Sequence, residues 1–486
     1  MGYIEKSLTE LLWDVKRKGS LGADTESPWG MLVAGTPGAV WGGVAGTTDA
    51  FMASIVIAGL GVSGLGCAAE LVRQGIPFSA YEKENGPGGL ARTDAVDGFR
   101  FDYGPHILLD PPEDIAEWFG GLPGLDLALC TGPSGIAMDA RLESVIPAPF
   151  QQNLNWLPLH VRARLLLDAA ASRGASGKPP GNYSEYAMAR CGRGIYDLFI
   201  RGYDSKRLRF ALNQIPADWT NRIEKTRWRS LIVPRSCARV FGAEKRESRF
   251  FYPRSGGMEA LPRAMAKLLP ESAIRYGRKL VEIDPRSKSL TFMDGTVASY
   301  EHLVSSLPLP EIVALIKQSP PEVRSAAENL AYTSIYVVSA GIDGTVPPWF
   351  LLRIPDSGMA FYRLSFPSHY SPGSAPEGKA IVVAEISHHP VRYPLSPGDA
   401  RKEFDRGLRR MGILQPGQKI LVETLRDIRY GHVLYNHATR ASIRFILEYL
   451  RAGSIFACGK YGQWRDMLIP QSILAGMAAA REIAAL

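Results

Sequence analysis

The segment SIVIAGLGVSGLGCAAELVRQGIPFSAYEKENGPGGLARTD, residues 54–94, decides the fold of this chain. Its apolar run at 55–58 is typical of a strand that is buried on both faces. Glycines follow at positions 59, 61 and 64, directly before a helical pattern. This spacing lets the chain turn tightly, approach a pyrophosphate and close the helix onto the strand. We therefore predict a dinucleotide-binding turn formed by Gly59, Gly61, Val62, Ser63 and Gly64.

An acidic residue and a second glycine-rich turn follow this motif. Glu82 ends the next predicted strand, 77–81, where a carboxylate can hold a ribose diol, and Lys83 comes next. In the run GGLAR, the two glycines let the backbone approach a cofactor closely for a second time. The guanidinium of its arginine can pair with phosphate. A lone glycine motif is often only a turn, but the added acid and arginine favour a cofactor site. Its predicted contacts in this run are Gly88, Gly89, Leu90, Ala91 and Arg92.

Length and composition indicate a globular protein of two to three domains. The chain has 486 residues, of which 46% are hydrophobic and 21% charged. The five cysteines are scattered and lack CxxC spacing, which argues against a disulfide framework or a zinc site and predicts a reducing, cytoplasmic location. His388 and His389 are adjacent, so in a strand they point to opposite faces, and we predict no metal site.

The net charge of +8 is concentrated in one block. Residues 190–249 contain 15 Lys and Arg against 6 Asp and Glu, with aromatic residues between them. Such a block attracts anions. It is interpreted either as a solvated arginine-rich helical face or as the lining for a phosphorylated or carboxylated small substrate. A nucleic-acid surface is the least favoured interpretation, so we predict no nucleic-acid partner.

Residues 1–51 do not fit the pattern of the rest. The stretch 27–48 is glycine-rich and broken by Pro37, and it follows a charged, amphipathic start. It would make a poor membrane span or signal peptide. We therefore expect either a dispensable N-terminal extension or a start codon assigned too early, and no membrane span.

The glycine motif, the acid and the GGxxRT run together resemble the FAD-binding half of the amine oxidase, protoporphyrinogen oxidase and UDP-galactopyranose mutase superfamily, in which FAD fills this site. The resemblance spans most of residues 52–486. It implies an α/β fold with a discontinuous Rossmann-type FAD-binding domain, a helical insertion and an antiparallel substrate sheet. The implied boundaries are 52–110, 245–310 and 441–486 for FAD, 111–244 for a mainly helical basic cap, and 311–440 for an α+β substrate-binding domain.

The resemblance also implies contacts with the cofactor further along the chain. Val281 would touch the adenine end of FAD. The last segment, 453–486, would close the FAD domain and aim a helix N-terminus at the flavin, where its dipole stabilises the anionic reduced ring. Gly459, Met467 and Gln471 are the expected contacts in this segment. No cysteine or histidine is placed by the resemblance to form a flavin linkage, so the FAD is expected to be non-covalent.

Three stretches resemble the UDP-galactopyranose mutase branch. DYGPHILLD, 102–110, would place Pro105 and His106 against the flavin ring, and FYRLSFPSHYSP, 361–372, would bring Tyr362 and Arg363 to the substrate pyrophosphate. GYDSKRLRF, 202–210, would supply the substrate-side Lys206. Each residue has an alternative. His106 could satisfy a backbone carbonyl, Arg363 could pair with a fixed internal carboxylate, and Lys206 could be solvated.

The sequence departs from the mutases near its end. Lys460 stands where the mutases carry an arginine, and a lysine is a point charge without the guanidinium fork. Asp466 and Pro470 also depart from the pattern. The leading hypothesis is therefore an FAD-dependent oxidoreductase, a dehydrogenase or oxidase, acting on a small anionic or sugar-nucleotide-like metabolite. His106 would position the substrate, and Arg363, Lys460 and Lys206 would bind its charge. The alternatives are a flavin-dependent sugar-nucleotide mutase without net redox change, and a flavin-stabilised binding protein. Substrate, electron acceptor and oligomeric state stay open.

Overall fold

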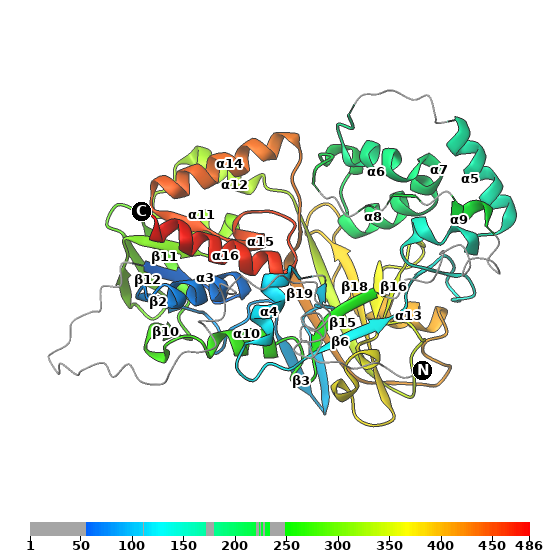
Figure 1. Ribbon diagram of the computed structural model, residues 1–486, viewed down its shortest axis with the longest axis horizontal. Coiled ribbons are helices and arrows are strands. Elements are labelled where there is room, and N and C mark those ends of the chain that lie inside the picture. Colours follow the sequence, from blue (N-terminus) through cyan, green and yellow to red (C-terminus); the bar gives the residue numbers. More distant parts are fainter. Residues whose placement is uncertain are drawn as a thin grey trace, which may run out of the picture.

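The computed structural model describes residues 55–109, 111–171, 179–219, 223, 225–226, 229–233 and 248–486. The prediction of a dispensable extension at 1–51 lies outside these residues, as do parts of the basic block 190–249. The described chain forms two lobes (Figure 1). Helices stacked on a short-stranded sheet lie at the left, and a longer sheet with a separate group of helices above it lies at the right.

A parallel sheet of five strands forms the base of the first lobe, in the order β10-β2-β1-β14-β20. Side chains of a strand alternate between its faces, so Ile55 and Ile57 pack into one core while Val56 and Ala58 pack into another. This burial on both faces confirms the Rossmann-type α/β fold that the apolar run predicted. The strands are β1 Ile55–Ala58, β2 Phe78–Tyr81, β10 Ile274–Arg275, β14 His302–Ser305 and β20 Ile455–Ala457.

Each face of this sheet is covered by its own set of elements. One core takes in α3 Val62–Arg73, α4 Glu113–Gly120, α10 Ala260–Ala266 and α16 Ile469–Ala484. The other takes in α11 Leu309–Leu315, α12 Pro321–Glu328, α14 His437–Ala452, α15 Gly459–Gly462 and the antiparallel meander β11 Leu280–Asp284, β12 Ser289–Phe292 and β13 Val297–Ser299. The meander turns at Asp294-Gly295, as the sequence predicted.

Glycines hold α3 against its strand and against α16, the closing helix (Figure 1). A Cβ atom on Gly476 would lie 1.9 Å from the carbonyl oxygen of Ser63, and one on Gly64 would lie 2.0 Å from that of Gly59. Because any larger residue would collide with backbone at these two places, the contacts require glycine. The closing helix is thereby fixed beside the turn that the sequence assigned to the cofactor.

The second lobe is built on a sheet of seven strands, in the order β19-β15-β18-β17-β16-β7-β8. All of its pairs are antiparallel except β16 with β7. The helix α13 Pro397–Arg410 packs on it. The strands are β7 Ser134–Ala137, β8 Val145–Pro147, β15 Tyr332–Asp343, β16 Leu351–Arg353, β17 Arg363–Ser365, β18 Lys379–His388 and β19 Ile420–Val433.

Segment 111–244 is less helical at its start than the sequence analysis expected. Its strands β7 and β8 extend the sheet of the second lobe, and β6 Leu127–Gly132 pairs with β9 Ser248–Pro253, which also pairs with β5 Leu108–Leu109. A hairpin of β3 Thr93–Val96 and β4 Phe99–Asp102 precedes them. β6 pairs with β9 and β7 pairs with β16 across more than 100 residues of sequence, so a local pattern does not predict where these strands pair.

The rest of this segment forms the helical group above the second sheet (Figure 1). Aromatic residues of the basic block fill its core, among them Tyr196, Phe199, Tyr203 and Trp219. These rings therefore pack the interior of the group, while most arginines between them remain at least partly exposed. The helices are α5 Leu159–Ala171, α6 Tyr183–Cys191, α7 Arg193–Ile195, α8 Arg201–Leu208 and α9 Arg229–Ile232, with a π-helical turn at Tyr196–Ile200.

Candidate functional site

The predicted cofactor residues gather at the carboxyl ends of the parallel strands, where open α/β sheets bind their ligands. Gly59 follows β1, Glu82 follows β2 and Gly459 follows β20. Ser306, which follows β14 and was not predicted, donates to the Gly59 carbonyl at 3.0 Å. These four strand ends share one edge of the sheet.

The start of α3 has the form of a phosphate site. Its N-cap residue, Gly61, provides no side-chain cap, so the amides of the first turn keep their unpaired N–H groups. The only atom within 4 Å of a Cβ placed on Gly61 is the Cα of Gly89, at 3.9 Å. A side chain at Gly61 would thus project into open space beside the helix N-terminus. The residues fit a diphosphate there, and its binding at this turn stays a prediction.

Glu82 is buried and organises the turn around this site. Its carboxylate accepts hydrogen bonds from the backbone N–H of Leu60 at 2.8 Å and of Glu84 at 3.0 Å. Each oxygen keeps a further lone pair, so the group still fits the predicted ribose contact. Arg92, predicted to pair with phosphate, lies 3.3 Å from Glu84 through Nη1 and Oε2. Its contact with a cofactor stays a prediction.

The outlying cofactor candidates are more exposed. Val281 is 40% exposed on β11, and Lys83 lies at the surface. Gln471 accepts from the Leu468 N–H at 2.9 Å and so caps α16, next to Met467. The structure leaves the cofactor roles of these four residues as predictions.

His106 lies between the two lobes, and charged residues of both lobes influence the pKa of its ring. Burial lowers its pKa to about 4, the charges of Lys460 and Arg363 act in the same direction, and Glu385 opposes them. Its Nδ1 atom is buried and has no hydrogen-bond partner. The alternative in which the ring satisfies a backbone carbonyl through Nδ1 therefore does not apply. A neutral ring with an unused nitrogen fits a position facing a bound group.

The pKa of His106 predicts a pH effect on stability. An unfolded histidine takes up a proton below about pH 6.5, whereas the folded ring resists it until about pH 4. The free energy of unfolding should therefore fall by roughly 3 kcal/mol as the pH drops through this window. The variant His106→Gln should lack this loss of stability. Melting curves of the parent and the variant at pH 7 and pH 4.5 measure the difference. His160→Gln, at an exposed histidine, is the control and should melt like the parent; a parallel loss in all three proteins would contradict the assignment.

Arg363 has an internal partner, which was the alternative weighed for it. Its Nε donates to Oε2 of Glu385 on the adjacent strand β18, and the hydroxyl of Tyr362 donates to Oε1 at 2.9 Å. Tyr362 is fully buried, so it orients Glu385. The side chain of Arg363 is 29% exposed, and its terminal nitrogens make no hydrogen bond to another described side chain. A role in substrate binding stays a prediction for these nitrogens.

Lys206 occupies a different place from the one predicted. Its ammonium is buried and donates to the carbonyls of Asp356, Met359 and Phe361 at 2.7, 3.2 and 3.0 Å. Burial lowers its pKa to about 7. All three of its donors are used to tie α8 to the loop before β17. We therefore correct the prediction: Lys206 is a structural link and not a substrate contact.

Lys460 lies near enough to His106 for its charge to lower the pKa of that ring, while its predicted role in binding a substrate anion stays a prediction. Two further charged residues lie in this region. Lys460 donates to the carbonyl of Gly431 at 3.3 Å. Sequence reasoning missed Glu385 and Arg353, although a single acid in the apolar run of β18 could have been found because a buried carboxylate requires a cation. Arg353 gave no signal, since its position opposite Arg363 depends on strand pairing.

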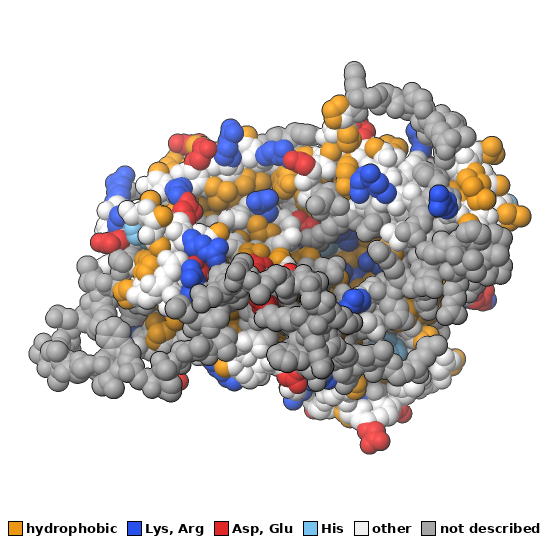
Figure 2. Space-filling model, in the orientation of Figure 1, with side chains coloured by type: hydrophobic (Ala, Val, Ile, Leu, Met, Phe, Trp, Pro, Cys, Tyr) orange, Lys and Arg blue, Asp and Glu red, His pale blue; other side chains and the backbone are white. Residues whose placement is uncertain are grey.

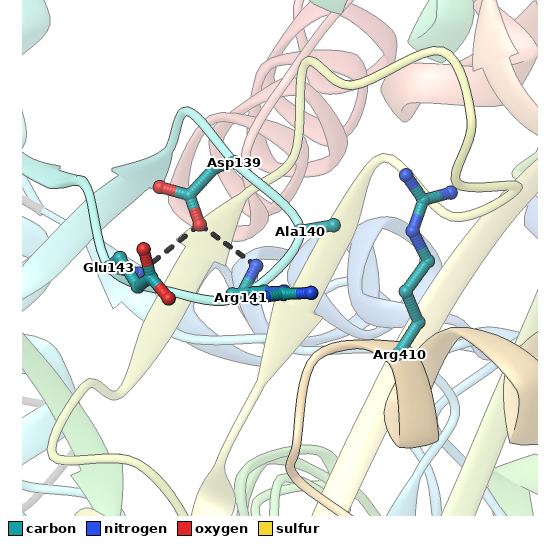
Figure 3. A pocket seen from close by; sticks show the side chains of 5 residues that line it. All are labelled: Asp139, Ala140, Arg141, Glu143 and Arg410. Atoms are coloured by element: carbon teal, nitrogen blue, oxygen red, sulfur yellow. Dashed lines mark hydrogen bonds between the residues drawn. The ribbon is translucent and has the colours of Figure 1, made fainter.

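A surface pocket of about 460 Å³ has none of these site residues in its lining (Figure 3). Asp139, Arg141, Glu143 and Arg410 line it, and Asp139 is occupied by hydrogen bonds from the N–H groups of its own loop. None of its lining residues belongs to the cofactor turn. Among the described residues no cluster of His, Cys, Asp and Glu could hold a metal ion, and no described helix has the length and apolar character to cross a bilayer.

A glycine turn on a parallel sheet, beside a second and mainly antiparallel sheet, defines an α/β protein of the Rossmann type. The family model of flavin-containing amine oxidoreductases matches residues 194–484, and the chain belongs to this family. The model of the NAD(P)-binding Rossmann-like domain matches residues 57–121. These matches confirm the superfamily that the sequence motifs indicated and support a flavin cofactor.

Curated proteins similar in sequence to this chain include desaturases, and solved structures with a similar fold include a mutase and an oxidase. The chain is 26% identical over 391 residues to the zeta-carotene-forming phytoene desaturase of Myxococcus xanthus, covering 69% of this chain and 73% of the relative. A 4,4'-diapophytoene desaturase of Staphylococcus aureus is 42% identical over 57 residues, 12% of this chain and 11% of that one. The structure of reduced UDP-galactopyranose mutase superposes with a TM-score of 0.82 at 24% identity, covering 90% and 94% of the two chains. The structure of a putrescine oxidase triple mutant superposes with a TM-score of 0.59 at 14% sequence identity, covering 89% of this chain and 98% of that chain. These structures show the same fold.

Proposed function

We propose that the protein is an FAD-dependent oxidoreductase that takes a hydride from a small anionic metabolite. The observation that carries the proposal is the buried, unpartnered Nδ1 atom of His106, in a ring close enough to Arg363 for the arginine's charge to lower its pKa. Flavin, when bound, supplies a two-electron acceptor. The start of α3 and Glu82 would hold the dinucleotide, and non-covalently, because no linking residue is placed by the resemblance.

The remaining work of this chain is binding and orientation. Arg363 would attract the anionic group of the metabolite, and His106 would hold the substrate through a hydrogen bond at Nδ1. Neutral at pH 7, His106 adds no charge beside Arg363 and Lys460. Among the described residues around His106 and Arg363, no carboxylate is both unpaired and accessible to such a substrate. We therefore propose no catalytic base.

The charges at this site also bear on the choice of substrate class. The Myxococcus xanthus relative is named for forming zeta-carotene, and a carotene is a hydrocarbon. Placing a hydrocarbon against Arg353, Arg363 and Glu385 would remove water from charged groups without replacing its hydrogen bonds. The cluster therefore favours an anionic metabolite over a carotenoid.

A sugar-nucleotide mutase without net redox change is the second candidate. Arg363 favours it, because a guanidinium matches a diphosphate. Lys460 in place of an arginine weighs against it.

Anaerobic titration of the flavin-loaded protein separates the two. An oxidised flavin that is bleached by an anionic metabolite, with formation of the oxidised metabolite, supports the oxidoreductase. Turnover of a UDP-sugar that starts only after reduction with dithionite, with no net oxidation, supports the mutase. A flavin that responds to neither would leave a binding protein and contradict the proposal.

Arg363→Lys tests the anion contact. Lysine keeps the charge but loses the fork, so affinity for UDP should fall by roughly tenfold to a hundredfold while FAD content stays unchanged. Calorimetric titration and melting curves on one preparation give both readouts. A dissociation constant within a factor of two of the parent, beside a clearly lower melting temperature, would make Arg363 only a structural partner of Glu385.

A further inference from the structure

Three parts of the chain meet at the side chain of Asp102, the last residue of β4. Its Oδ1 atom accepts hydrogen bonds from the hydroxyl of Thr93 at 2.6 Å and from the N–H of Met258 at 3.1 Å. Its Oδ2 atom accepts from the hydroxyl of Tyr252 on β9 at 2.7 Å. Burial raises the pKa of this carboxyl to about 6, although the three hydrogen bonds favour the charged form. Asp102 is thus ionised at pH 7.5 and ties β4 to residues 150 and 156 positions further along the chain.

Thr93 joins the end of the GGLAR run to this network. Its N–H donates to Oε2 of Glu259 at 3.2 Å, and its hydroxyl accepts from the Glu259 N–H at 3.2 Å. A Cβ atom on Gly257 would lie 2.4 Å from that hydroxyl oxygen, and Gly257 has a φ of +70°, so this close packing requires glycine. The backbone directly after Arg92 is therefore fixed at one place.

The same aspartate begins the loop that carries His106. In this loop the N–H of Tyr103 donates to the carbonyl of Arg92 at 3.0 Å, and the N–H of His106 donates to that of Gly104 at 2.7 Å. The Nδ1 atom of His106 has no hydrogen-bond partner, so it does not anchor the ring. The ring therefore depends on the backbone of residues 102–105 for its position.

The position of this ring matters because His106 lies between the two lobes. On the face shown in Figure 2, basic side chains lie in the hollow between the lobes. Burial lowers the pKa of the ring to about 4, with Lys460 and Arg363 acting in the same direction. A loop that came loose would expose the ring to water and end this burial. The accessibility of His106 therefore measures how firmly its loop is held.

We propose that Asp102 is a positioning residue, which holds the His106 loop and the GGLAR turn in one fixed arrangement. Binding of a dinucleotide at this turn then also fixes the place of His106. The inference rests on the proposed function, in which the Nδ1 atom of His106 holds the substrate. An amide at position 102 would keep one accepting oxygen and turn an NH₂ group towards the donors, so at least one of the three hydrogen bonds would be lost.

The test combines FAD binding with chemical modification of histidine in the full chain at pH 7.5. Asp102→Asn should weaken FAD affinity roughly tenfold in fluorescence titration, which is the effect of losing one hydrogen bond to a charged group. Diethyl pyrocarbonate acylates accessible neutral imidazoles. It should modify His106 of this variant roughly tenfold faster, even at saturating FAD, because the loop opens more readily. Mass spectrometry of the peptides gives the rate for each histidine.

Two controls accompany the variant. His388, buried in the second sheet, is the internal control and should keep its rate. Asp97→Asn is the matched variant, because Asp97 is an exposed residue of the same hairpin and asparagine tolerates its φ of 49°. It should change neither measurement. Thr93→Val, which removes the hydroxyl that donates to Asp102, repeats the experiment if Asp102→Asn does not fold.

The outcomes are distinct. An FAD affinity or a His106 rate within about a factor of two of the parent would overturn the positioning role, even if the melting temperature fell. A parallel rise at His388, which would mean general loosening, or a parent that binds no FAD would overturn it as well. If both effects appear but no anionic metabolite bleaches the flavin of the parent, Asp102 keeps its role and the proposed oxidoreductase fails.

Discussion

Gly61→Val should give a folded protein that holds no flavin. The backbone torsions of Gly61 are open to any residue, since φ is −64°, and its neighbours leave room for a Cβ. The branched methyl groups would instead fill the space beside the first turn of α3, where a diphosphate must approach. Loss of the cofactor is therefore expected without loss of the fold.

Flavin absorbance per protein and circular dichroism measure the two effects separately. Gly398→Val is the matched control, because Gly398 also has room for a side chain but lies on α13, remote from the turn. It should keep its flavin. Normal flavin content in Gly61→Val would show that the diphosphate does not lie at the start of α3.

Glu385→Gln should be the most destabilising single charge change in the second lobe. It leaves Arg363 without its carboxylate partner, and breaking a buried pair by removal of one partner costs about 3 to 5 kcal/mol. The lower end is expected, because the Arg363 side chain is 29% exposed. Pyrophosphate should restore part of the loss by supplying the missing negative charge.

Urea unfolding with and without pyrophosphate measures both effects. Glu423→Gln is the control: this glutamate of β19 pairs with Arg401, whose side chain is 46% exposed, so its change should cost at most about 1 kcal/mol. Equal destabilisation in the two variants would mean that Glu385 carries no buried ion pair of consequence.

The first lobe could be predicted from the sequence because its signals are local. The run at 55–58, the glycines at 59, 61 and 64 and the acid at 82 fall within one βαβ unit, and each has a physical reason independent of distant residues. The fold around them followed from the resemblance to the superfamily. Gly59 and Glu82 therefore follow β1 and β2 as the sequence predicted, while their contacts with a cofactor stay predictions.

The second lobe was predicted less well, because long-range strand pairing decides it. The strands β7 and β8 join a sheet whose other strands begin at residue 332, and Arg353 meets Arg363 only through the register of β16 with β17. The Lys206 prediction was wrong because three carbonyl groups, which no sequence pattern displays, surround its ammonium. Glu385 carried a usable signal, a lone acid in an apolar strand.

The identity and stoichiometry of the bound cofactor test the central claim most directly. The purified protein, or the protein after incubation with FAD and gel filtration, is denatured by heat, and the released compound is identified by chromatography and mass spectrometry. We expect about one equivalent of intact FAD in the supernatant and none on the precipitated chain. A protein that neither carries nor takes up FAD, or a flavin that stays attached after denaturation, would contradict a non-covalent dinucleotide at the start of α3.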